Sequence, residues 1–541
     1  MPKRGRSLVQ LRLPSAPLGR DSDGDRRLNP GSVSKIDWRK VPSYWGALLI
    51  AGVFAAFALV LLLTKRPWVD EAWFTGPALD LVTRGKFGTL LLDPAGSHLR
   101  LYKPDAFLRG INEHTYWVMP LHLLQLAAWG KVFGFSVFSM RMPSVLWGGV
   151  TLASIGLIVR RLYGGRGAAL IGAAVLAVDF GFVNGAADGR MDMTCAALGF
   201  AGLAVYLSLR EANFPGAVMA AHALAAGAVF THPNGVFGSV GLLLTMLWLD
   251  RHRVRPLTVA LIAAPYLVFG LLWAIYCLQA PADFAAQFSA NSAARASDVL
   301  APWRGVWREI NGRFRNHFWP EGSAMGKLKI VGILVYVAAL GTLASAKSLR
   351  QNAGCRLLLW LTLLQFLCLS ILASTKYTYY MVYILPYFAA ATGIAASYLW
   401  SSYGSRVRVV CVAALASYLA VQTAAVINLS VVTGGYRKEY TPAIAYLKST
   451  LRPDDLIMGT AELGFSLGFQ NPQLVDDVWF GYWSGRRATV LVVDRWYYEQ
   501  VIEVASSRGM PTPGYFDALF KSCQLVREFK SYRIYRRATA K

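Results

Sequence analysis

A few ionisable residues lie beside long apolar runs, where charged side chains are costly to keep. Asp70 and Glu71 follow the first apolar run, and Asp188, Arg190 and Asp192 stand between two later ones. A carboxylate in such a place can take a proton from a hydroxyl group. A Lys or Arg can bind a phosphate and neutralise the charge that develops on it. These residue types therefore favour group transfer from an anionic, lipid-linked donor.

Further polar residues lie at the ends of other apolar runs. His232 ends one run in FTHPNG, and Lys376 stands in STKYTYYMVY with Tyr377, Tyr379 and Tyr380. These tyrosines and Trp303 could line an acceptor groove or belong to the aromatic belt at the membrane interface. His114 precedes a further apolar stretch, but it has no HxxxH or HxH spacing. No metal site is predicted on that ground.

Each of these residues also has a structural explanation. The Asp70–Glu71 pair could be a solvated helix start, and Arg190 with Asp192 could be an ion pair at the end of a span. His232 before a proline could simply end a helix, and Lys376 could be an interface anchor. The gathering of such residues from five separate stretches favours a common site over several independent structural roles.

The composition shows what must position these residues. The chain has 541 residues, of which 55% are hydrophobic and 16% are charged, and its formal net charge is +25. A soluble globular domain carries about 25% charged residues. The basic residues fall between apolar runs, which argues against a nucleic-acid partner and for a protein that crosses the lipid bilayer many times.

The hydropathy predicts an α-helical multispanning membrane protein with about eleven spans. The expected spans are 44–64, 143–160, 168–187, 192–209, 216–232, 236–249, 256–279, 328–346, 357–374, 379–400 and 408–429.

The positive clusters between spans set the predicted orientation, because Lys and Arg collect in cytoplasmic loops. All clusters can be cytoplasmic together only if the apolar stretch 117–138 does not cross the bilayer. We therefore expect this stretch to lie along the outer interface. The N-terminus is then cytoplasmic and the C-terminus extracytoplasmic, and the candidate residues share the outer face.

The domain organisation follows from this topology. A basic cytoplasmic tail is expected over 1–43 and a transmembrane domain over 44–429. Its external loops are 65–142 and 280–327. Residues 430–541 are expected to form a small extracytoplasmic α/β domain.

The evidence for that last domain is a change of pattern. DLIMGT, LVDD and TVLVVD are typical of short buried strands. Helical stretches are expected at 441–451, 496–508 and 514–522.

The chain resembles, over roughly 44–400, the polytopic lipid-phospho-sugar glycosyltransferases with the GT-C fold. These include dolichyl-phosphate-mannose protein mannosyltransferases and the bacterial lipid A aminoarabinose transferase. The motifs that carry the resemblance are Asp70-Glu71 through Gly85, His114-Thr115-Tyr116-Trp117, Phe133-Gly134, Arg141-Met142-Pro143, Gly189-Arg190-Met191-Asp192, and Lys376 followed by Tyr383-Ile384-Leu385-Pro386. The family has two prolines after a His or Lys at the position of His114, and this chain has Thr115 and Tyr116 there instead.

The resemblance implies roles for particular residues. It implies Asp70 as the catalytic base, Asp192 as a second active-site carboxylate and Lys376 as a ligand of the donor phosphate. From charge alone, we expect Arg190 to bind a phosphate or a carboxylate. Glu71, His114, His232, Tyr377 and Tyr380 complete the expected substrate-binding set.

The resemblance further implies transfer of a sugar from a polyprenyl-phosphate donor to an acceptor hydroxyl, with inversion, in the inner (plasma) membrane. The acceptor is a lipid, a glycan or a protein. No cofactor is expected to be required, and a divalent cation stays open as an alternative.

Two other functions stay open as alternatives. The first is a lipid or solute transporter or flippase without chemistry, which would need ionisable groups near span centres and interrupted helices. The second is a non-catalytic assembly protein that binds through residues 430–541.

Overall fold

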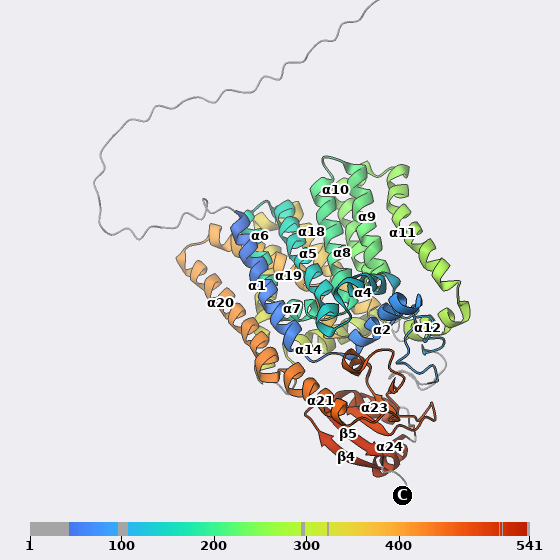
Figure 1. The fold of residues 1–541 in the computed structure, drawn as a ribbon. Coiled ribbons are helices and arrows are strands. Elements are labelled where there is room, and N and C mark those ends of the chain that lie inside the picture. Colours follow the sequence, from blue (N-terminus) through green and yellow to red (C-terminus); the bar gives the residue numbers. More distant parts are fainter. Residues whose placement is uncertain are drawn as a thin grey trace, which may run out of the picture. The chain divides into compact units, whose positions relative to one another are not determined.

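A computed structural model of the chain describes residues 43–95, 107–293, 298–321, 324–507, 509–510 and 512–537. By its contacts the chain divides into two compact units, Met1–Trp45 and Gly46–Lys541. Nearly all of the predicted basic tail lies outside the described residues. The elements below, apart from the first residues of α1, belong to the second unit (Figure 1).

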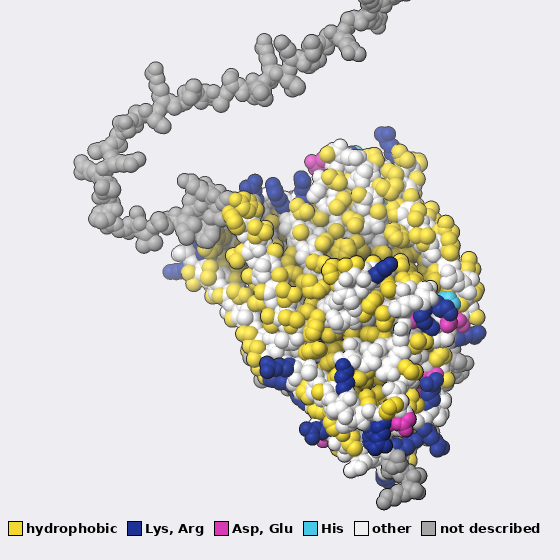
Figure 2. Space-filling model, viewed as in Figure 1, with side chains coloured by type: hydrophobic (Ala, Val, Ile, Leu, Met, Phe, Trp, Pro, Cys, Tyr) yellow, Lys and Arg dark blue, Asp and Glu magenta, His cyan; other side chains and the backbone are white. Residues whose placement is uncertain are grey.

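Long apolar helices dominate the described part of the chain. Seven of them are long and apolar enough to cross a membrane, and a bent pair would make an eighth. The seven are α1 Ser43–Thr64, α5 Val137–Tyr163, α8 Met191–Leu209, α9 Phe214–Thr231, α11 Pro256–Cys277, α18 Ala353–Leu372 and α20 Ser405–Ile427. The last of them continues as one helical run to Thr450. Hydrophobic side chains cover this part of the surface in Figure 2. The multispanning class is confirmed.

The remaining predicted spans also coincide with helices. They are α10 Gly235–Asp250, α16 Ile330–Ser345, α19 Leu385–Ser402 and the bent pair α6 Arg166–Val178 with α7 Phe180–Ala186. Helices α10 and α16 are 16 residues long, shorter than the roughly 20 residues that a bilayer usually needs.

The bend between α6 and α7 is 67° and has an identifiable cause. Asp179 stands between the two helices in extended conformation, and its side chain accepts a hydrogen bond from the Phe182 backbone N–H at 2.9 Å. Its other oxygen accepts from the hydroxyls of Tyr336 at 2.7 Å and Tyr418 at 2.8 Å. These donors compensate the burial of a carboxylate at a helix break.

The stretch 117–138 forms one short helix followed by the start of α5. Helix α4 covers Pro120–Phe133, and 14 residues rise only roughly 21 Å, less than the bilayer core. It packs against α2, Val69–Arg84, and against α5 and α9. Both its length and its packing agree with the non-spanning helix predicted here.

Shorter elements connect the long helices. They are η1 Arg251–Arg253, α12 Pro281–Ala293, α13 Pro302–Arg308, η2 Glu309–Phe314, α14 Arg315–Phe318, α15 Ala324–Lys327, α17 Lys347–Gln351 and η3 Thr378–Tyr383.

A five-stranded sheet forms near the C-terminal end, in the strand order β2-β1-β3-β5-β4. The strands are β1 Ile457–Gly459, β2 Leu474–Asp476, β3 Val490–Asp494, β4 Cys523–Glu528 and β5 Tyr532–Arg537. Strand β1 pairs in parallel with β2 and β3, and the β4–β5 hairpin adds to β3 in antiparallel fashion. The helices of this C-terminal region are η4 Asn428–Thr433, η5 Tyr436–Tyr440, α21 Thr441–Thr450, η6 Ala461–Leu463, α22 Gly464–Leu467, α23 Arg495–Ser507 and α24 Thr512–Lys521.

The segment 65–142, predicted as the first external loop, contributes to this sheet region. Leu92 forms an isolated parallel bridge with Asp476 of β2. Val69, Ala72 and Trp73 of α2 share one hydrophobic core with the strands. The C-terminal sheet is therefore packed onto the start of α2, and the boundary predicted at residue 430 stays a prediction.

A glycine contact between α6 and α19 supplies one test of the helical packing. A Cβ on Gly393 would lie 2.3 Å from the Ala168 carbonyl oxygen and 2.8 Å from Gly172 Cα. We expect Gly393→Val to destabilise the protein by about 1–3 kcal/mol, because neither backbone can move aside easily. Gly341→Val is the matched control, since nothing lies within 4 Å of that position. Equal melting temperatures of the two variants in detergent would contradict the packing.

Candidate active site

The start of α2 sets the direction of the first two carboxylates. The backbone N–H of Trp68 donates to Glu71 Oε2 at 2.8 Å, which caps the helix. Asp70 and Glu71 both lie in the first turn, where the helix dipole stabilises negative charge. Successive residues of a helix point about 100° apart. The two side chains therefore meet different partners.

Glu71 lies in a buried ion pair with Arg141 of α5. Both carboxylate oxygens accept from the guanidinium at 2.7 Å, and Oε1 also accepts from the Gly189 N–H at 2.8 Å. Arg141 also donates to the carbonyls of Leu62 at 2.8 Å and Arg66 at 2.9 Å. The side chains of this pair are at most 1% exposed. The pair joins the end of α1, the start of α2 and α5, and substrate binding by Glu71 stays a prediction.

Asp70 instead turns toward Arg190, and the two form an ion pair. Arg190 Nε also donates to Asp192 Oδ2 at 3.0 Å. The side chain of Asp70 is 20% exposed, whereas those of Arg190 and Asp192 are 4% exposed. The structure thus brings together three of the predicted residues, and Asp70 is the one that solvent reaches best.

The start of α8 positions two of these residues. Arg190 is the residue before the first turn of α8, and Asp192 lies within that turn. The first turns of α2 and α8 therefore meet at the Asp70–Arg190 pair. At this point the two helix N-termini stabilise the negative charges of Asp70 and Asp192, which Arg190 pairs with.

A run of tyrosines in η3 covers Arg190 and extends away from it. The Tyr379 ring centroid lies 3.8 Å from Arg190 Cζ, a cation–π contact. Tyr377 stacks on Tyr379 at 4.9 Å, and Tyr380 packs edge-on against Tyr379 at 4.8 Å. His232 lies 5.7 Å from the Tyr380 ring. The predicted Tyr377, Tyr379, Tyr380 and His232 are thus neighbours, and Tyr379 is the tyrosine that contacts Arg190.

Lys376 lies in a second ionic cluster. Its Nζ lies 3.1 Å from Asp298 and 3.4 Å from Glu309, and it donates to the Ser370 carbonyl at 2.6 Å. Arg313 forms an ion pair with Glu309 and lies over the Tyr380 ring at 5.4 Å. The tyrosines of η3 therefore separate this cluster from Arg190.

Two further histidines, His114 and His122, differ in their relation to the site. His114 stacks on Tyr116 at 5.5 Å and lies 6.1 Å from the Tyr276 ring, so its contacts are to a different aromatic group. His122 of α4 packs edge-on against Phe74 at 5.4 Å. Burial lowers the pKa of His122 to about 4, although the nearby charge of Asp192 opposes this. His122 is therefore a neutral neighbour of the site that was not predicted.

No group of three or more His, Cys, Asp or Glu residues that could hold a metal ion occurs in the described ranges. The expectation that no cofactor is required is not decided by this and stays a prediction.

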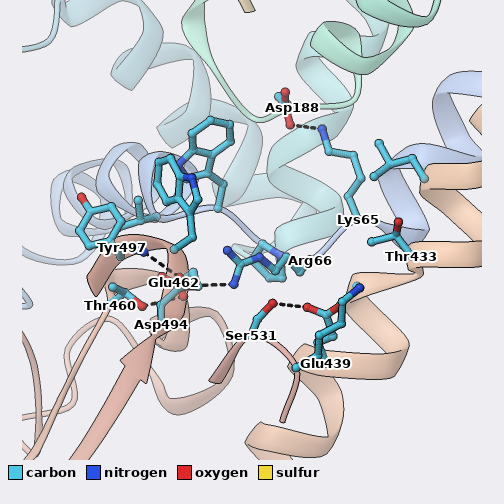
Figure 3. A pocket seen from close by; sticks show the side chains of 17 residues that line it. Lys65, Arg66, Asp188, Thr433, Glu439, Thr460, Glu462, Asp494, Tyr497 and Ser531 are labelled. Atoms are coloured by element: carbon cyan, nitrogen blue, oxygen red, sulfur yellow. Dashed lines mark hydrogen bonds and ion pairs between the residues drawn. The ribbon is translucent and has the colours of Figure 1, made fainter. Parts of the chain in front are cut away.

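A cleft of about 470 Å³ opens beside the same start of α2 (Figure 3). It lies between the α1–α2 connection, the end of α20 and the connections of the sheet. The cleft is lined by Lys65, Arg66, Pro67, Trp68, Val69, Asp188, Leu429, Thr433, Gly435, Glu439, Thr460, Glu462, Asp494, Trp496, Tyr497, Lys530 and Ser531. Trp68 also lies 5.9 Å from Arg190 Cζ, so the cleft adjoins the Asp70–Arg190 pair.

Two buried carboxyls of the sheet predict how stability depends on pH. Burial raises the pKa of Asp476 to about 8 and that of Glu462 to about 7. The folded state therefore keeps protons that the unfolded chain has lost. This stabilisation is complete below about pH 4, the ordinary range of these groups, and is lost as the pH rises through 7 and 8.

We therefore expect the melting temperature to fall by several degrees between pH 5 and pH 9. Asp476→Asn should flatten this slope, because the amide is neutral at every pH and its oxygen can accept from Trp73 Nε1, which lies 2.7 Å from the present carboxylate. Asp454→Asn, at an exposed position, is the control. An unchanged slope in Asp476→Asn would contradict the prediction.

Comparison with known proteins finds one matching family and several similar folds. Residues 117–277 match the family profile described as dolichyl-phosphate-mannose-protein mannosyltransferase. They fall inside the range over which the sequence resembles lipid-phospho-sugar transferases. No curated protein sequence matches the chain.

Solved structures share the fold at low sequence identity. ArnT from Cupriavidus metallidurans, bound to undecaprenyl phosphate, superposes with a TM-score of 0.57 and 15% identity, covering 92% of this chain and 99% of that one. The apo oligosaccharyltransferase of Archaeoglobus fulgidus superposes with a TM-score of 0.53 and 11% identity, covering 86% and 71%. The chain therefore shares the fold of ArnT and of this oligosaccharyltransferase, and its residues 117–277 are similar to the dolichyl-phosphate-mannose-protein mannosyltransferase family.

Proposed function

We propose that the protein transfers a sugar from a polyprenyl-phosphate donor to an acceptor hydroxyl, with inversion at the sugar carbon. The observation that carries the proposal is the Asp70–Arg190–Asp192 group at the joined N-termini of α2 and α8. It combines a partly exposed carboxylate with a buried cation, as a hydroxyl nucleophile and a phosphate leaving group require.

The reaction is a single displacement. Asp70 accepts the proton of the acceptor hydroxyl as its oxygen bonds to the anomeric carbon. The bond from that carbon to the phosphate oxygen breaks, and the electron pair leaves with the polyprenyl phosphate. Attack opposite the leaving group inverts the carbon.

Arg190 links donor binding to activation of Asp70. In the present structure its guanidinium is shared between Asp70 and Asp192. A donor phosphate would compete for that guanidinium, which frees Asp70 to accept a proton. Asp192 and Tyr379 keep Arg190 in place, and Tyr383 in turn donates to Asp192 at 3.3 Å.

Lys376 is proposed as a second ligand of the donor phosphate. It now contacts Asp298, Glu309 and three carbonyl oxygens, so it would have to leave these partners to reach a phosphate. No step of the displacement requires a metal ion, and a divalent cation stays an alternative that chelation by EDTA would test.

The relatives support the substrate classes. The ArnT structure holds undecaprenyl phosphate, which supports a polyprenyl-phosphate donor. A structure of the Archaeoglobus fulgidus oligosaccharyltransferase tethered with an acceptor peptide (TM-score 0.50, 10% identity) supports an acceptor beside the same fold. Here a lipid, a glycan and a protein are all candidate acceptors.

We propose that the protein lies in the inner membrane with its N-terminus cytoplasmic and the sheet region outside. Basic residues follow the ends of α5 and α10, at Arg166 and Arg251. Positive charge favours the cytoplasmic side. The sheet lies at the other end of these helices in Figure 1.

The direct test of the function in cells is a deletion strain. Mass spectrometry of envelope glycolipids and glycans should show one sugar missing, and the wild-type gene should restore it. The identity of the missing sugar would identify the donor, and the molecule that lacks it would identify the acceptor. An unchanged envelope, with substrate accumulating in proteoliposomes without chemical change, would contradict transfer and favour transport.

A further inference from the structure

The cleft beside Trp68 is built differently from the Asp70 site. Its walls come from the α1–α2 connection on one side and from the sheet region on the other. Its volume of about 470 Å³ falls within the ~300–1,000 Å³ typical of small-molecule sites. The mechanism proposed above assigns no role to the residues of the sheet that line it.

The charged groups in the cleft disfavour an anionic ligand. Its three cations all have carboxylate partners. Lys65 is paired with Asp188, Arg66 with Asp494, and Lys530 lies 3.6 Å from Glu439. A phosphate or an anionic lipid headgroup would have to break these pairs and would then meet four carboxyl groups.

Glu462 instead offers an unused hydrogen-bonding atom. Its residue is 2% exposed, and Oε1 accepts from Thr460 at 2.6 Å and from Tyr532 at 3.1 Å. Within the described part of the chain, its buried Oε2 has no hydrogen-bond partner. Buried polar atoms are rarely left unsatisfied, so this carboxyl suits a ligand with a hydroxyl group.

Aromatic rings supply the other half of a carbohydrate site. Trp68, Trp496 and Tyr497 line the cleft, and Trp496 is 47% exposed. The Trp68 and Trp496 rings pack edge to face at 6.1 Å. A sugar ring has an apolar C–H face that can pack on such a ring, while its hydroxyls bond to carboxyl and hydroxyl groups at the edges.

We propose that this cleft binds a hydroxylated sugar ring of the acceptor and holds it beside Asp70. Trp68 lines the cleft and lies 5.9 Å from Arg190 Cζ, and Arg190 is paired with Asp70, so a ring bound here lies next to the Asp70–Arg190 pair. That it belongs to the acceptor rests on the proposed function. Glu462 and Trp496 are the residues that recognise it.

The experiment measures binding of two kinds of probe to the full-length protein in nanodiscs. Free maltotriose and N,N′,N″-triacetylchitotriose stand for the acceptor and are followed by saturation-transfer NMR. A radiolabelled polyprenyl-phosphate mannose stands for the donor and is followed by a filter-binding assay. Trp496→Ala and Glu462→Gln are compared with Trp307→Ala, whose side chain is also exposed but lies outside the cleft.

We expect at least one oligosaccharide to bind the wild type. Trp496→Ala should weaken this binding by about tenfold through loss of one aromatic face, and Glu462→Gln by about tenfold through loss of a hydrogen bond to the carboxyl group. Donor binding should change less than about twofold, and Trp307→Ala should bind both probes like the wild type. Loss of donor binding with unchanged oligosaccharide binding would overturn the acceptor assignment. Absence of binding by both oligosaccharides would overturn the site.

A second comparison separates this inference from the proposed function. Asp70→Asn should bind the oligosaccharide like the wild type, because Asp70 does not line the cleft. If that variant transferred sugar at the full rate, the proposed mechanism would fail while the cleft assignment would stand.

Discussion

Asp70→Asn should lower the rate of sugar transfer by about 10²–10⁴-fold, the usual contribution of a positioned general base. The amide cannot accept the proton of the acceptor hydroxyl. The side chain keeps its size, and its 20% exposure limits the cost to folding. The rate is measured as labelled sugar transferred in vesicles that contain a polyprenyl-phosphate sugar and envelope lipid extract.

The control for this substitution is Asp454→Asn, an identical chemical change at an exposed position of the sheet region. It should transfer sugar at the wild-type rate. Asp454→Asn should melt like the wild type, and Asp70→Asn should stay folded with only a small fall in melting temperature, because Arg190 keeps its pair with Asp192. Full activity in Asp70→Asn would remove Asp70 from the mechanism.

The largest effect on stability is expected from Arg141→Met. The substitution leaves the carboxylate of Glu71 buried without its cation, which costs about 3–5 kcal/mol for pairs of this kind. It also removes the donors to the carbonyls of Leu62, in the last turn of α1, and of Lys65 and Arg66, which follow that helix. Thermal unfolding in detergent should show a large fall in melting temperature.

Two further variants show whether the buried charge is the cause. Arg141→Met with Glu71→Leu should recover part of the loss, because no unpaired charge is then buried. Arg109→Met breaks a pair with Asp283 in which the arginine is 54% exposed, and it should cost at most about 1 kcal/mol. Similar melting temperatures for Arg141→Met and Arg109→Met would contradict the buried-pair account.

The local pattern of the sequence was sufficient to predict much of the fold. Apolar runs and their lengths identified the helices, because hydropathy is a property of each segment alone. The same holds for DLIMGT, LVDD and TVLVVD, which form β1, β2 and β3. The β4–β5 hairpin was missed because its strands carry charged residues, such as Arg533 between the buried Tyr532 and Ile534.

The site was predictable only where topology brings residues to one face. Asp70, Arg190 and Asp192 were grouped because each stands at the same end of its span, and the structure joins them. The partners of Glu71 and Lys376 were not predicted, because Arg141 and Asp298 lie about 70 residues or more away in the sequence. No local pattern encodes such a pairing. Glu462 could not be predicted as a site residue either, because its role depends on burial beside a cleft that no local sequence pattern indicates.

The most direct measurement of the central claim is release of polyprenyl phosphate from a labelled polyprenyl-phosphate sugar by the purified protein in vesicles. We predict release that requires an added acceptor, with an equal amount of sugar appearing on that acceptor with inverted stereochemistry. Release should fall by orders of magnitude in both Asp70→Asn and Arg190→Gln. Sugar that crosses the vesicle membrane still attached to its lipid, with no polyprenyl phosphate released, would contradict the account.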